Sequence, residues 1–158
     1  MPADLTRFGA AGRLLVADGW KVVVTGNTPG SASVNTRDKT IRIKPAVARA
    51  AANPASRASS YVLRHEVAHA VHDMLLDQSC DELEQARNLT HTAALECVAD
   101  TWCLYEVPTR QMRRWVRSSV IWHGRIGRRY RWSDVTSLEA WALVDLLHCL
   151  AAEREAAQ

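Results

Sequence analysis

The stretch that decides the fold is "LRHEVAHAVHD", residues 63–73, in which three histidines and a glutamate stand among alanine, valine and leucine. These residues are His65, Glu66, His69 and His72. A buried helix accepts polar groups only where they have partners, because an unsatisfied group destabilises the fold by about 1–3 kcal/mol. Some partner must therefore satisfy these side chains.

The spacing of the polar residues points to a metal ion as that partner. Each helical residue advances by about 100°, so His65 and His69 lie on nearly the same face and can direct two imidazoles at one point. Glu66 lies beside them, where it can reach a water molecule on the same ion. This is the H-E-x-x-H arrangement, in which two neutral nitrogens bind Zn²⁺ and the glutamate acts as general base. We therefore predict His65 and His69 as metal ligands and Glu66 as the catalytic residue.

A second apolar segment with two carboxylates offers a third ligand. In "ALECVAD", residues 94–100, Glu96 and Asp100 are four apart and share one helical face. We predict that Glu96 binds the metal and that Asp100 accepts a hydrogen bond from the far nitrogen of a ligand histidine, which fixes its tautomer. His91 is the competing third ligand, because it precedes this helix and loop geometry can turn it either way.

The remaining histidines and two tyrosines receive weaker predictions. His72 is expected to support the site or line its cleft, since it follows His69 by less than one turn. His123 and His148 have no companions at ligand spacing and are expected on the surface or in the core. Tyr61 and Tyr105 are candidates to stabilise an oxyanion, with a packing role as the alternative.

The rest of the chain predicts an α+β fold. Residues 5–19 have helical spacing, and residues 20–25, 31–35 and 39–44 are typical of a small antiparallel sheet. Further helices are predicted from Pro45, from Asn53-Pro54 to about Asp77, and over residues 92–106, 109–120 and 136–155. For the last helix, Thr136 and Glu139 have the spacing of a capping box.

The composition fits a single domain over residues 1–158. Hydrophobic residues make up 47% of the chain, enough for a core. No segment has the roughly 18 consecutive apolar residues of a membrane span, and residues 1–20 lack the pattern of a signal peptide. We therefore expect a cytoplasmic protein without a membrane partner. Residues 109–158 are expected to form a helical C-terminal extension of the domain.

That extension contains an arginine-rich segment. Between Val107 and Ser133 there are eight arginines and no acidic residue. The first four have helical spacing on one face: Arg110, Arg113, Arg114 and Arg117. Basic side chains interleaved with aromatic ones can bind phosphates and stack on bases, so nucleic acid is a candidate partner. The alternative is a solvated helical face.

The two motifs together resemble a known family. "YVLRHEVAHAVHD" followed by "ALECVADTWCLYEVP" is similar to the ImmA/IrrE-type zinc metallopeptidase domain, of the gluzincin branch of zincins. The resemblance covers roughly residues 15–110. It implies a zincin-like fold, in which a small antiparallel sheet packs on the HExxH helix and further helices. It also implies limited cleavage of a bacterial or phage regulator, such as a repressor or a toxin-system protein.

Three functions therefore remain open. The first is a regulatory zinc peptidase with His65, His69 and Glu96 as ligands. The second is a DNA-associated protease that resembles SprT-like proteins, whose usual third ligand is a histidine and which would favour His91. The third is a catalytically silent binding module in which zinc joins two helices.

Overall fold

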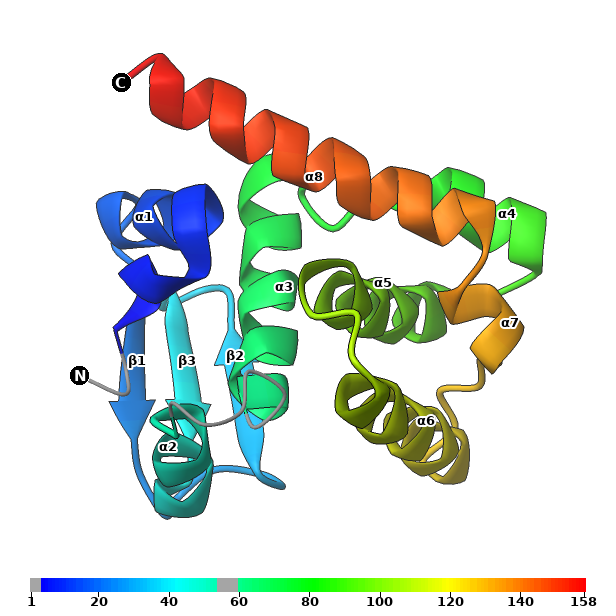
Figure 1. Ribbon diagram of the computed structural model, residues 1–158, viewed down its shortest axis with the longest axis horizontal. Helices are drawn as coiled ribbons and strands as arrows, with labels where there is room; N and C mark the ends of the chain where they lie inside the picture. The colour runs from blue at the N-terminus through cyan, green and yellow to red at the C-terminus, as the bar shows by residue number, and fades with distance from the viewer. Residues whose placement is uncertain (1–3, 54–59) are drawn as a thin grey trace.

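The computed structural model describes residues 4–53 and 60–158 of the chain. Within these ranges the fold is α+β, as predicted, with a small sheet on one side and most of the helices on the other (Figure 1). The strands are β1 (Lys21–Val24), β2 (Ala32–Asn35) and β3 (Thr40–Ile43). The helices are η1 (Leu5–Phe8), α1 (Gly9–Ala17), α2 (Pro45–Ala51), α3 (Tyr61–Leu76), α4 (Asp81–Arg87), α5 (His91–Glu106), α6 (Arg110–Arg125), α7 (Trp132–Val135) and α8 (Leu138–Ala156).

The sheet is mixed, so the prediction of an antiparallel sheet was wrong for one pair of strands. Its order is β1-β3-β2, with β2 antiparallel and β1 parallel to β3. The hairpin between β2 and β3 follows the sequence pattern. β3 lies in the centre, where Ile41 and Ile43 are fully buried, whereas the valines of β1 are only partly buried or exposed. Both β1 and β2 pair with β3, which places Ile41 and Ile43 at the centre of the sheet and buries them.

Helix α3 carries the HExxH motif through the middle of the molecule. It packs against β2 and β3 on one side and against α5 on the other (Figure 1). Its apolar face is formed by Leu63, Val67 and Val71, all fully buried. The predicted start of this helix at Pro54 lies outside the described residues. The helix ends at Asp77, which has a left-handed conformation (φ 51°).

The polar stretch after α3 forms the two-turn helix α4. A short connection then leads into α5, whose N-cap is Thr90. The Thr90 hydroxyl accepts a hydrogen bond from the backbone N–H of Ala93. Helices α3 and α5 are thereby placed side by side, which brings the two sequence motifs together.

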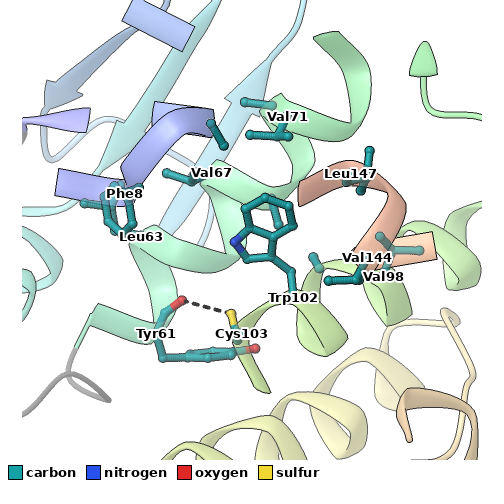
Figure 2. Close-up of a cluster of buried hydrophobic side chains, with 14 of the residues drawn as sticks. Phe8, Tyr61, Leu63, Val67, Val71, Val98, Trp102, Cys103, Val144 and Leu147 are labelled. Atoms are coloured by element: carbon teal, nitrogen blue, oxygen red, sulfur yellow. Dashed lines mark hydrogen bonds between the residues drawn. The ribbon is translucent and has the colours of Figure 1, made fainter. Parts of the chain in front are cut away.

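Trp102 of α5 fills the centre of the core. Its side chain is fully buried and stacks on His148 of α8, with ring centroids 3.8 Å apart. Figure 2 shows it between Val67 of α3 and Leu147 of α8. One large side chain thus joins three helices.

The C-terminal helices belong to the same core. Helix α8 packs against α1 and α5, and α6 packs against α5. The N-cap of α8 is Ser137, whose hydroxyl accepts from the N–H of Ala140, so the predicted capping box of Thr136 and Glu139 was wrong. Thr136 instead ends α7 and donates to the carbonyl of Trp132.

Among the described helices, none combines the length and the apolar character that crossing a membrane requires.

We predict that Trp102→Ala lowers the free energy of unfolding by about 3–5 kcal/mol, because it leaves a large cavity at the contact of three helices. Urea denaturation followed by circular dichroism measures this change. Trp122→Ala is the matched control, since the Trp122 side chain is 56% exposed; it should change the free energy by no more than about 0.5 kcal/mol. Equal effects of the two substitutions would contradict the central role of Trp102.

Candidate metal centre

The three predicted ligands converge between α3 and α5. Nε2 of His65 lies 3.2 Å from Oε1 of Glu96 and 3.2 Å from Nε2 of His69. Nε2 of His69 lies 2.6 Å from the same oxygen. A tetrahedral zinc ion with bonds of about 2.0–2.1 Å holds its nitrogen and oxygen ligands about 3.3 Å apart. Two sides of the donor triangle match this spacing, and the third, at 2.6 Å, requires His69 and Glu96 to move apart by about 0.7 Å to admit an ion.

Asp100 lies behind His65 and determines which of its nitrogens is free. Nδ1 of His65 is 2.9 Å from Oδ1 of Asp100, which is fully buried. An ionised carboxylate only accepts hydrogen bonds, so His65 donates from Nδ1. Nε2 is then the nitrogen that faces the site, and it can bind an ion once its own proton has left.

Two tyrosines complete the surroundings of Asp100. The hydroxyl of Tyr61 donates to Oδ1 at 2.6 Å, and that of Tyr130 donates to Oδ2 at 2.5 Å. Burial and the negative charge of Asp100 raise the pKa of both hydroxyl groups, so they remain protonated donors. Tyr61 is thus engaged with Asp100, on the far side of His65. Tyr105 donates to the exposed Asp145, so neither tyrosine is free to stabilise an oxyanion.

The second oxygen of Glu96 is held by residues that the sequence did not indicate. Nε2 of His123, from α6, lies 3.0 Å from Oε2 of Glu96. Arg128 donates to the same oxygen at 2.5 Å. His123 was expected on the surface or in the core, and it is indeed buried, but beside a predicted ligand. No local spacing indicates this contact, because it depends on how α6 packs against α5.

These donors keep Glu96 ionised although it is buried. Burial alone would raise its pKa, but hydrogen bonds from three histidines lower it far below its usual value. For His65, burial opposes the charged form, yet the hydrogen bonds and charges of Asp100 and Glu96 raise its pKa well above the usual value. Without a cation, histidine protons therefore neutralise the carboxylates. A metal ion would replace such protons, so metal binding should release them.

Glu66 lies next to this site and is not engaged. Its side chain is half-buried, and within residues 4–53 and 60–158 it has no hydrogen-bonding or ionic partner. The carboxylate is therefore available to accept a proton.

The structure does not bring His91 to the predicted centre. Its Nδ1 lies 3.0 Å from Oε2 of Glu84, on α4, and close to the thiol of Cys80. The competing prediction for the third ligand is corrected accordingly, because the first turn of α5 faces α4 while Glu96, further along, faces α3. His72 donates from Nε2 to the carbonyl of Ser79 at 2.8 Å and so supports the loop after α3.

The arginine stripe of α6 faces solvent. The side chains of Arg110, Arg113, Arg114 and Arg117 are all exposed. Among the described residues none of the four has an ion-pair partner, although the guanidinium of Arg117 lies 4.1 Å from the ring centroid of Trp132. The predicted helical face is therefore present as a stripe of positive charge that has no acidic partner among the described residues.

We predict that Asp100→Asn lowers the affinity for zinc by about 10–100-fold, because it removes the charged acceptor that orients His65. Competition with a chromophoric chelator measures the affinity, and a thermal melt verifies folding. Asp145→Asn is the control, since its carboxylate bonds to Tyr105 on the exposed side of α5 and α8. Unchanged zinc affinity in folded Asp100→Asn would show that this carboxylate does not orient the ligand.

The comparisons with known proteins do not indicate a function, so any proposal has to start from the geometry of the site. No protein-family model, curated protein or solved structure matches the chain. The resemblance to ImmA/IrrE-type domains therefore rests on the two sequence motifs alone.

Proposed function

We propose that the protein is a zinc-dependent metallopeptidase of the ImmA/IrrE type, with His65, His69 and Glu96 as ligands and Glu66 as general base. The observation that carries this proposal is the triangle of His65 Nε2, His69 Nε2 and Glu96 Oε1, whose sides are 3.2, 2.6 and 3.2 Å. Three protein ligands leave a fourth position open, which is the arrangement of catalytic rather than structural zinc sites.

The residues around the triangle have distinct tasks in this proposal. A bound zinc ion would supply Lewis-acid activation of water and of a substrate carbonyl. Glu66 accepts the proton of the attacking water and later donates it to the leaving amine. Asp100 accepts the hydrogen bond of Nδ1 of His65, so Nε2 is the nitrogen that would bind the ion after losing its proton. His123 and Arg128 hold Oε2 of Glu96, which leaves Oε1 for the ion.

Peptides are the substrates that the surroundings favour. Strand β2 lies at one edge of the sheet and packs against α3, the helix that carries the site. An extended peptide can add to such an edge through main-chain hydrogen bonds, which brings its carbonyl groups to the neighbouring helix. Limited cleavage of a regulatory protein in the cytoplasm, such as a repressor or a toxin-system protein, follows from the resemblance alone.

A DNA-associated protease is the second candidate, favoured by the exposed arginine stripe of α6. The ligand set does not favour it, because the third donor beside the two histidines of α3 is a glutamate and not His91.

The arginine stripe of α6 allows a quantitative prediction for DNA binding. If DNA binds there, replacing Arg113, Arg114 and Arg117 with alanine lowers affinity and reduces the salt slope of log K by about 1 for each phosphate that is no longer neutralised. Fluorescence anisotropy with a duplex of random sequence, at several salt concentrations, measures both quantities. Binding that does not depend on salt would reject the stripe as a nucleic-acid surface.

Glu66→Gln separates a peptidase from a silent zinc-binding module. We predict a rate about 10²–10⁴-fold lower with unchanged zinc content, because only the base is removed. A library of peptides analysed by mass spectrometry supplies the substrate, and elemental analysis supplies the metal content. Glu153→Gln, an exposed residue of α8, is the control. Full activity of Glu66→Gln would exclude Glu66 as the base, and a wild-type protein that binds zinc but cleaves no peptide would favour the silent module.

A further inference from the structure

Cys80, Glu84 and His91 form a second cluster of metal-ligating side chains, which shares no residue with the site described above. The thiol of Cys80 donates to Oε2 of Glu84 at 3.2 Å. Nδ1 of His91 lies 3.0 Å from the same oxygen and 3.6 Å from the sulfur. One donor atom of each residue thus faces the other two.

The spacing of these atoms fits a tetrahedral zinc ion. With bonds of about 2.3 Å to sulfur and about 2.0–2.1 Å to nitrogen and oxygen, sulfur lies about 3.5 Å from the lighter ligands, and nitrogen about 3.3 Å from oxygen. The observed distances of 3.2, 3.6 and 3.0 Å differ from these values by no more than about 0.4 Å. Small side-chain movements are therefore sufficient to admit an ion.

Local structure holds the three residues in place. Cys80 is the N-cap residue of α4, and Glu84 follows one helical turn later. Helix α4 ends at Asn88, whose left-handed conformation (φ 53°) turns the chain toward His91, the first residue of α5. The cluster therefore joins the start of α4 to the start of α5.

One side of the cluster is buried in the protein and the other is exposed to solvent. Cys80 is 3% exposed, whereas the side chain of His91 is 49% exposed. An ion held by the three residues would have its fourth position toward solvent. A thiolate and an imidazole beside one carboxylate favour zinc over magnesium or calcium, which prefer oxygen ligands.

The protonation states agree with a site that exchanges a proton for a cation. Burial and the neighbouring Glu84 raise the pKa of Cys80 to about 12, so the thiol is protonated at neutral pH without a metal. Hydrogen bonds from His91 and Cys80 lower the pKa of Glu84, which stays ionised. An entering cation would take the position of the thiol proton between these groups.

We propose that Cys80, Glu84 and His91 bind a second zinc ion, with its fourth position open to water or to a ligand of a partner. The ion joins the start of α4 to the start of α5, in the connection that places the two metal-binding helices side by side. This site does not depend on peptidase activity.

Cobalt substitution tests the proposal, because only the second site contains a thiol. Protein freed of metal by a chelator is titrated with Co²⁺, and we expect a thiolate-to-cobalt charge-transfer band in the near ultraviolet. The band should be lost in Cys80→Ser and in His91→Ala. It should persist in His69→Ala, which removes a ligand of the first site. Elemental analysis of the zinc-loaded protein should show one zinc ion fewer in Cys80→Ser than in the wild type.

Cys149→Ser is the matched control, since Cys149 is an exposed free cysteine that could bind cobalt by itself. It should leave the band unchanged. Circular dichroism verifies folding, and His91→Ala keeps the test valid if Cys80→Ser fails to fold, because His91 is exposed. A wild-type protein without the band, a band that remains in His91→Ala, or a band lost in Cys149→Ser or in His69→Ala would each overturn the proposal.

Discussion

The rest of the centre depends on the ionised carboxylate of Glu96. This group is buried, and an unpaired charge in the interior would strongly destabilise the fold. It is tolerated because each of its oxygens faces a different set of donors: Oε1 faces His65 and His69 on α3, and Oε2 faces His123 and Arg128. The same carboxylate thus joins α5 to α3 on one side and to the end of α6 on the other. The packing of these helices, and the metal binding that we propose, therefore depend on one electrostatic requirement.

Asp100 meets a similar requirement one turn further along α5. It is fully buried, and it is satisfied by Tyr61, His65 and Tyr130. These contacts fix the orientation of the imidazole of His65, which we propose as a ligand, before any ion is present, so little reorganisation would accompany binding. Glu66 has no such partner among the described residues and stays available. The contrast between fully engaged carboxylates and a free one separates residues that build the site from the residue to which we assign the proton transfer.

Much of this site is predictable because it rests on spacing within single helices. Positions four apart lie on one face, so His65 with His69, and Glu96 with Asp100, could be paired without knowledge of the fold. The order of the strands in the sheet was harder to predict from the sequence. The pattern of apolar residues in the three strands fits any order of strands, and the parallel pairing of β1 with β3, which sets Val22 beside the buried Ile41, is visible only in the structure. The prediction for the N-cap of α8 was wrong because Thr136 and Ser137 are both favoured N-cap residues. In the structure Thr136 is the C-cap of α7, and Ser137 is the N-cap of α8.

The sequence by itself determined the fold class, the helices that carry the motifs and the residues with metal-binding spacing. The tertiary structure alone decided that His123 and Arg128 reach Glu96, and that His91 turns to Cys80 instead of the first centre. The physical reason is the distance along the chain over which each constraint acts. Helical periodicity fixes directions within one element, whereas a contact between α6 and α5, or across the α4–α5 turn, depends on how whole helices pack to bury their apolar faces.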